Sequence, residues 1–191
     1  MTEASENTHN ETGNRAAEAG ALWGGRFASG PSPELQLLSK STQFDWALAQ
    51  YDIRGSKAHA VALAAAGYLS AEELEDMHAA LDELSTRVAD GRALAADDDE
   101  DVHSALERLL IEITGVQLGG KLRAGRSRND QIATLVRLYL LDHAATIEQL
   151  LLDLATAILD QSLAHPEAIL PGRTHLQHAQ PVLLAHQLAA H

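Results

Sequence analysis

Apolar residues recur every three or four positions along most of the chain, which is the spacing that places them on one face of an α-helix. The first such segment runs from Phe44 to Ala66. We expect a helix there that is interrupted or bent around Gly55 and that stops at Gly67, because glycine weakens a helix interior and commonly follows a helix end.

Two further helices are predicted before residue 116. Ser70 and Glu73 have the spacing of a capping box, and Gly91 ends an apolar stripe formed by Leu74, Met77, Leu81, Leu84 and Val88. The acidic run Asp97–Asp101 leads into a second stripe that Gly115 closes. Because acids are favourable at a helix N-terminus, we interpret most of this run as a solvated first turn.

One long helix is predicted from Asp130 to His165, a stretch without glycine or proline. At 1.5 Å per residue it would be roughly 50 Å long, which is more than a small globule can use. Its apolar residues cover more than one face, so we expect a bundle shared with other helices or subunits.

The chain beyond this helix is broken by prolines and then becomes polar. We expect an irregular polar connection over Thr174–Gln180, followed by an apolar helix over Val182–Ala190 whose first turn begins at Pro181. The sequence stops at His191 inside that helix, which we interpret as the mark of a fragment or truncated product.

These patterns define an all-α protein with three parts. Residues 1–20 are expected to be a disordered tail, residues 21–125 an N-terminal helical domain, and residues 126–191 the first, truncated part of a central helical-bundle domain.

Composition narrows the functional classes. The 191 residues are 46% hydrophobic but only 4% aromatic, which favours helices, and the net charge of −13 disfavours wholesale nucleic-acid binding. The absence of cysteine excludes a disulfide, a thiolate zinc site and a cysteine nucleophile. No apolar stretch has the length of a membrane span, and residues 1–21 lack the apolar core of a signal peptide, so we expect a cytoplasmic protein without membrane contact.

The first stretch that could carry chemistry is GGKLRAGRSRND at Gly119–Asp130. Four basic residues on a glycine-rich loop before a helix N-terminus could bind a carboxylate or phosphate, with help from Ser127 or Asn129. The structural alternative is that the arginines pair with this chain's many acids and that Asn129 only caps the helix.

Two other polar stretches stand between apolar helices. PGRTHLQHAQP at Pro171–Pro181 offers Thr174 and His175 for positioning and proton transfer, unless it is a plain helix connection. In EDVHSALE, His103 and Glu107 lie one turn apart and could pair or face a pocket. No HExxH motif occurs, so the histidines predict no metal site.

Four blocks together resemble the argininosuccinate lyase family of the fumarase/aspartase superfamily, in order and spacing: LWGGRF at Leu22–Phe27, EDVHSALE at Glu100–Glu107, GKLRAGRSRNDQ at Gly120–Gln131, and PGRTHLQHAQP at Pro171–Pro181. The resemblance implies a fumarase/aspartase-like helical fold, a homotetramer with active sites shared between subunits, and no cofactor. It also implies reversible elimination of fumarate from argininosuccinate to give arginine, in arginine biosynthesis.

The resemblance also assigns roles to particular residues. His175 matches the family's acid/base histidine, and His103 matches a histidine that lines the site. Asn129, Thr174, Arg128 and Ser41 match substrate-binding positions. Arg173 stands where an aromatic residue is common.

One catalytic element of the family is absent from these 191 residues, the serine loop GSSxMPxKxNP. We therefore expect little or no lyase activity from this chain alone. Two alternatives stay open, another fumarate-releasing lyase of the superfamily and a non-catalytic helical module that only oligomerises.

Overall fold

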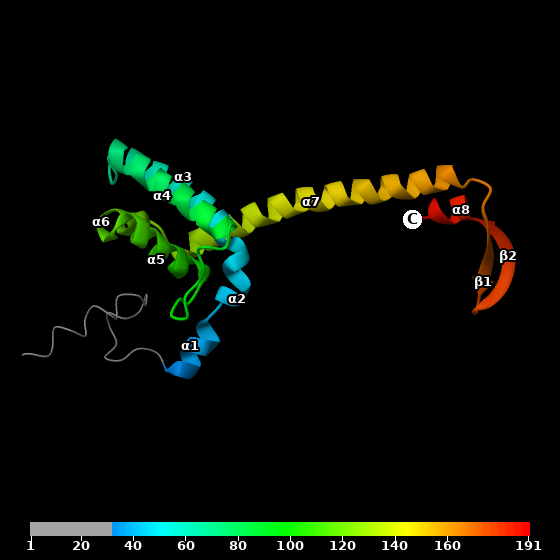
Figure 1. The fold of residues 1–191 in the computed structure, drawn as a ribbon, viewed down its shortest axis with the longest axis horizontal. Coiled ribbons are helices and arrows are strands. Elements are labelled where there is room, and N and C mark those ends of the chain that lie inside the picture. Colours follow the sequence, from blue (N-terminus) through cyan, green and yellow to red (C-terminus); the bar gives the residue numbers. More distant parts are fainter. Residues whose placement is uncertain (1–31) are drawn as a thin grey trace, which may run out of the picture. The chain divides into compact units, whose positions relative to one another are not determined.

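The computed structural model describes residues 32–191, so the tail expected over residues 1–20 and the LWGGRF block lie outside the described residues. The described part is mostly helical, with one two-stranded sheet (Figure 1). This confirms the predicted helical fold class. None of the described helices combines the length and the apolar character that crossing a bilayer requires.

The chain divides into two compact units, residues 1–136 and 137–191. The described part of the first unit begins with α1 (Pro33–Ser39), α2 (Thr42–Asp45), the 3-10 turn η2 (Trp46–Leu48) and α3 (Ala49–Ala65). It continues with α4 (Ala71–Ala89), α5 (Val102–Thr114), α6 (Val116–Gly119) and η3 (Gly120–Arg123), and it includes the start of α7 (Arg128–Ala164). The domain boundary expected after residue 125 stays a prediction.

Helices α3, α4 and α5 surround the hydrophobic core of the first unit (Figure 1). Met77, Leu81 and Leu84 of the predicted α4 stripe are buried, and the Ser70–Glu73 capping box is present. Asp101 is the N-cap of α5, where it forms a second capping box with Ser104. Burial of these stripes is what drives the packing of the short helices, because such helices are marginal on their own.

The interruption predicted as one possibility at Gly55 is wrong, because α3 runs through this residue, and a bend there stays a prediction. The break in the helix instead falls at η2, before residue 49. Ile53 and Ser56, on either side of Gly55, are buried, so tertiary packing overrides the weak helix propensity of glycine. A Cβ atom at Gly55 would lie 3.5 Å from Nη2 of Arg126, so this face of α3 lies against a guanidinium group.

The second unit holds most of α7, the strands β1 (Ile169–Thr174) and β2 (Gln177–Leu183), and α8 (Leu184–Leu188). The long helix predicted for Asp130–His165 is confirmed, since α7 covers 37 residues. Many large apolar side chains of α7 are exposed in the single chain; Leu150 and Leu151, for example, are each 61% exposed.

The polar connection over Thr174–Gln180 and the start of the helix from Pro181 are corrected by the structure. Residues 174–183 belong to an antiparallel hairpin, and the helix expected over Val182–Ala190 begins only at Leu184, as α8. Pro171 pairs with Pro181 in register, and an isolated two-stranded ribbon tolerates these prolines because all its strands are edges. Gly172 has no room for a side chain, since a Cβ atom there would lie 2.6 Å from the carbonyl oxygen of Gln180.

Candidate active site

A small cavity of about 90 Å³ opens in the first unit, among α3, α4, α5, the segment 119–128 and the start of α7. One part of its lining is apolar and comes from the core leucines of α4 and α5. The other part is polar and brings together side chains that are far apart in the sequence, namely Asp52, Ser56, His103, Glu107, Arg123, Arg126, Arg128 and Gln131.

Asp52 lies at the centre of the polar part and is only 2% exposed. Its Oδ2 accepts a hydrogen bond from Nδ1 of His103 at 2.5 Å. The side-chain amide nitrogen of Gln131 donates to Oδ1 at 2.7 Å and to Oδ2 at 2.9 Å. The hydroxyl of Ser56, one helical turn further along α3, donates to Oδ1 at 3.2 Å. The buried carboxylate is therefore fully satisfied, as a buried charge requires.

Opposing effects act on the two charged groups of this cluster. Burial by itself would raise the pKa of Asp52, but hydrogen bonds from His103 and Gln131 and the charge of Arg126 together hold that pKa below its usual value. Burial also lowers the pKa of Arg126, against the opposite pull of Asp52 and Asp130. Nη2 of Arg126 lies 3.6 Å from Oδ1 of Asp52, so the half-buried guanidinium and the buried carboxylate compensate each other.

Helix α3 also holds the basic loop that precedes α7. Nε2 of His59 is hydrogen-bonded to the carbonyl oxygen of Ala124 at 3.0 Å, and Nη1 of Arg126 donates to the hydroxyl of Ser56 at 2.8 Å. These contacts fix the loop immediately before Arg128.

Ser127, and not Asn129, caps the N-terminus of α7. The backbone N–H of Asn129 donates to Oγ of Ser127 at 3.2 Å, and the N–H of Ser127 donates to Oδ1 of Asp130 at 2.8 Å. This corrects the structural alternative in which Asn129 caps the helix. The side chain of Asn129 is exposed in the first turn of α7, where a helix N-terminus favours anionic ligands.

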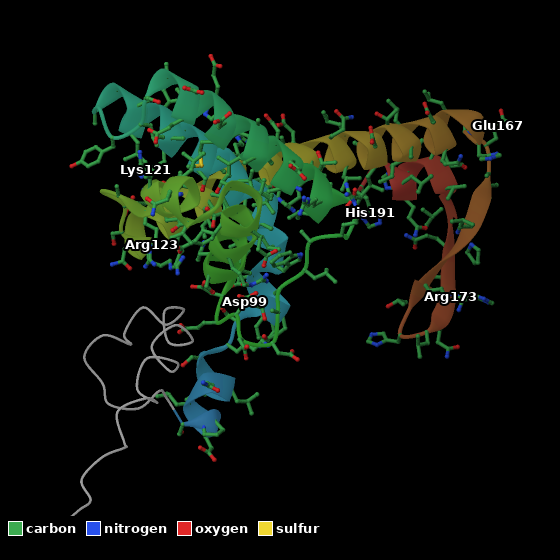
Figure 2. The ribbon with its side chains drawn as sticks, turned by 60° about the vertical axis from the view of Figure 1, so that its left-hand side comes forward. Asp99, Lys121, Arg123, Glu167, Arg173 and His191 are labelled. Atoms are coloured by element: carbon green, nitrogen blue, oxygen red, sulfur yellow. The ribbon has the colours of Figure 1, made fainter. Side chains whose placement is uncertain are left out.

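The other basic residues of the loop pair with acids of the same unit, as the structural alternative expected. Lys121 pairs with Glu73, and Nη1 of Arg123 lies 3.2 Å from Oε1 of Glu107. Figure 2 labels Lys121 and Arg123, which belong to η3. Nε of Arg128 lies 3.5 Å from Oδ2 of Asp101 at the N-cap of α5.

Ser41 lies at the same end of α5. Its hydroxyl donates to Oδ2 of Asp45 at 2.6 Å, and both carboxylate oxygens of Asp45 accept from the backbone N–H of Val102 at 3.2 Å. Ser41, Arg128 and His103 are thus brought together around the first turn of α5, although they are spread over almost ninety residues of sequence.

His103 and Glu107 do not pair with each other. His103 is 5% exposed and is bound to Asp52, whereas Glu107 is bound to Arg123, and both side chains line the cavity. Of the two possibilities for this helix face, the structure therefore selects the pocket.

Thr174 and His175 belong to the second unit and are described there by themselves. Thr174 ends β1 and pairs with Gln177 across a two-residue turn. His175 and Leu176 form that turn with φ of 50° and 63°, a left-handed backbone that is costly for residues other than glycine. The turn leaves His175 exposed at the tip of the hairpin. Within residues 32–191, no group of three or more His, Cys, Asp or Glu side chains is placed to hold a metal ion.

Sequence reasoning missed Asp52 and Ser56, which organise the cluster. A signal existed, because both occupy the otherwise apolar buried stripe of α3, together with Ala49, Ile53, Ala60 and Leu63. A carboxylate and a hydroxyl one turn apart on a buried face must meet polar partners from elsewhere. The spacing could not identify those partners.

Residues 25–191 match the family described as "Lyase", and the chain belongs to that family. It is 64% identical over 177 residues to the argininosuccinate lyase of Clavibacter michiganensis subsp. michiganensis, covering 93% of this chain and 36% of that protein. It is 68% identical over 174 residues to the argininosuccinate lyase of Leifsonia xyli subsp. xyli, covering 91% of this chain and 37% of the relative.

A solved structure supports the same fold. A variant of EDDS lyase with bound fumarate matches 85% of this chain and 32% of its own chain, with a TM-score of 0.58 and 24% identity. The chain thus spans about a third of the length of the relatives that it matches.

Proposed function

We propose that this chain is part of an argininosuccinate lyase, which releases fumarate from argininosuccinate and leaves L-arginine. The observation that carries this proposal is the identity of 64–68% to argininosuccinate lyases over more than nine tenths of the chain. The placement of Arg128, His103 and Ser41 around one helix end supports it, because an anionic substrate needs local positive charge in a protein whose net charge is −13.

The reaction is an elimination that needs a base, a stabilised anion and an acid. A base removes the proton next to a substrate carboxylate, and the electron pair is delocalised into that carboxylate. The C–N bond then breaks, the electron pair forms the double bond of fumarate, and the departing guanidine nitrogen receives a proton. Cations and N–H donors around the carboxylate lower the energy of the intermediate.

We assign the residues as follows. Arg128 contacts a substrate carboxylate, and Asn129, exposed in the first turn of α7, donates to it, aided by the positive end of that helix. Ser41 and Thr174 hold the substrate through their hydroxyls, and His103 lines the site. His175 is the catalytic residue that exchanges a proton.

The assembly proposed for the whole protein is a cytoplasmic homotetramer with active sites that combine residues of several subunits. The exposed leucines of α7 support it, because a long helix with apolar residues on several faces requires partners. We also propose that the reaction uses no cofactor and that the protein binds neither nucleic acid nor membranes.

Fumarate release by the native full-length protein tests the proposed substrate. Argininosuccinate, adenylosuccinate and aspartate are supplied separately, and fumarate is followed by its ultraviolet absorbance. We expect turnover with argininosuccinate alone. Release from adenylosuccinate or aspartate instead would assign another lyase of the superfamily.

His175 is tested in the same protein with His178 as its matched control, because both histidines are exposed on one hairpin. His175→Asn is expected to lower kcat by about 10²–10⁴-fold, the usual contribution of general acid–base catalysis. His178→Asn should change kcat less than threefold. Equal losses in the two variants would remove His175 from catalysis.

The 191 residues alone are expected to be inactive, because the serine loop of the family is not among them. A polypeptide of these residues should release no fumarate from argininosuccinate. Release in proportion to the concentration of that polypeptide would contradict this expectation.

A further inference from the structure

Four donors from separate parts of the first unit converge on one buried carboxylate, that of Asp52. Nδ1 of His103, the amide of Gln131 and the hydroxyl of Ser56 are hydrogen-bonded to it, and the guanidinium of Arg126 lies at 3.6 Å. These donors stabilise the ionised form of Asp52, so a negative charge remains at the centre of the site. The depressed pKa of Asp52, the net result of burial and these donors, is consistent with that charge.

This arrangement determines which nitrogen of His103 carries a hydrogen. An ionised carboxylate can only accept hydrogen bonds, so the ring nitrogen next to Oδ2 must donate. Nδ1 therefore bears a hydrogen whether the imidazole is neutral or protonated. In the neutral ring, Nε2 is left as an acceptor, on the opposite side of a side chain that lines the cavity.

The same carboxylate is also contacted by residues that lie before and after Arg128 and Asn129 in the sequence. Arg126 precedes Arg128 and Asn129, and Gln131 follows them in the first turn of α7. Because Arg126 and Gln131 both contact Asp52, the segment between them, which holds Arg128 and Asn129, is anchored from either side to the group that orients His103. A change at Asp52 should therefore disturb groups that meet the substrate, although Asp52 itself is buried.

We propose that Asp52 is a positioning residue, which holds His103 with a hydrogen on Nδ1 and with Nε2 presented to the substrate in the cavity. This inference rests on the proposed function, since it is the elimination of fumarate that gives His103 a substrate to contact. A comparable orienting carboxylate keeps the catalytic histidine of hydrolytic triads in its working tautomer.

Kinetics of the native full-length protein test the role, with Asp52→Asn compared with Asp99→Asn. Asp99 is a matched control, because it is also a buried, ion-paired aspartate of the first unit but is bound to Arg108 and not to His103. We expect Asp52→Asn to lower kcat/KM for argininosuccinate at least tenfold, and Asp99→Asn to change it less than threefold. Similar losses in both variants would reduce Asp52 to a structural residue.

A double-substitution cycle shows whether Asp52 acts through His103. His103→Asn keeps a donor near the Nδ1 position but removes Nε2. In that background, Asp52→Asn should lower kcat/KM less than threefold, because the group that it positions is already lost. A loss equal to that in the wild-type background would overturn the proposal.

Imidazole nitrogen chemical shifts of the histidine-labelled protein test the orientation without activity, with His103→Asn identifying the signal. We expect a hydrogen on Nδ1 of His103 in the wild type, and a transfer to Nε2 or a mixture of tautomers in Asp52→Asn. A neutral wild-type ring with its hydrogen on Nε2 would overturn the proposal. If the wild type releases no fumarate from argininosuccinate, the proposed function fails, whereas these shifts still decide whether Asp52 fixes the tautomer of His103.

Discussion

Two buried aspartates of the first unit, Asp52 and Asp99, are kept ionised by the groups that they contact. Burial alone would raise the pKa of Asp52 and of Asp99, yet both lie below the ordinary 3.8. For Asp99 the opposing contacts are Nη2 and Nε of Arg108 at 2.7 and 3.1 Å and the backbone N–H of Ala96 at 2.7 Å. Donors placed by the fold therefore outweigh the cost of removing each carboxylate from water.

The depressed pKa values predict how stability depends on pH. A carboxyl group with a lower pKa when folded contributes stability above its unfolded pKa, and this contribution is lost as pH falls through the folded pKa. Asp99→Asn should therefore lower the free energy of unfolding by about 1–3 kcal/mol at neutral pH, since it removes hydrogen bonds to a charged group. Asp52→Asn should act in the same direction.

Urea unfolding between pH 7 and pH 3 measures this difference against the wild type. The gap between wild type and variant should be constant above about pH 5, roughly one unit above the unfolded value of 3.8, and should narrow below it. A gap that widens with acid would contradict the assigned direction of the shifts.

At the scale of elements, α5 is the helix that positions the proposed site. Its N-terminus is satisfied by the Asp101–Ser104 capping box and by Asp45, and Ser41 is bound to Asp45. Its C-terminus meets Gly115, which has φ of 77°, and then α6, whose Gly119 packs on the last turn of α5. Tight packing at both ends of one helix places His103 relative to Ser41 and the basic loop.

Gly119 and Gly120 form a matched pair for testing this packing. A Cβ atom at Gly119 would lie 2.6 Å from Oγ1 of Thr114 and 3.2 Å from Cα of Ile111, whereas one at Gly120 would meet nothing within 4 Å. Gly119→Ala should destabilise the protein by about 1–3 kcal/mol, the usual cost of overpacking. Gly120→Ala, with its helical φ of −63°, should be neutral or stabilising by up to about 1 kcal/mol.

Chemical denaturation of the two variants beside the wild type gives both values. The interpretation requires that the denaturation midpoints of the two variants differ while their m-values stay equal. Equal midpoints for the two alanine variants would show that the end of α5 is not closely packed against α6.

At the scale of the whole molecule, α7 is a helix whose apolar side chains are exposed to solvent in a single chain. Leu140, Leu150 and Leu154 are between 57% and 61% exposed, and Leu150 and Leu154 lie one turn apart on one face. Apolar surface of this extent favours association with other helices, because its removal from water is the main driving force available. The proposed homotetramer supplies such partners.

Replacing the two leucines tests the role of this helix in assembly. Leu150→Asn combined with Leu154→Asn should convert the native full-length oligomer into smaller particles, measured by light scattering at several concentrations. Asp160→Asn, at an exposed polar position of the same helix, should leave the particle mass unchanged. An unaltered mass for the double variant would show that this face of α7 is not an interface.

The sequence by itself determined the features that depend on neighbouring residues. The α4 stripe, its capping box and the uninterrupted α7 follow from local spacing, and the structure has all three. The resemblance to a lyase family could also be read from short motifs. Local spacing did not predict that α3 continues through Gly55 or that residues 169–183 form a hairpin. A helix interior and a paired strand both depend on the residues that pack against them or pair with them.

Only the tertiary structure decided which residues form the polar cluster. Asp52, His103 and Gln131 are separated by 51 and 28 positions, and no periodicity relates them. Packing of α3, α5 and the first turn of α7 brings their side chains within hydrogen-bond distance. A buried charge must find its partners wherever the fold places them, so the partners of Asp52 are a property of the packing and not of the local sequence.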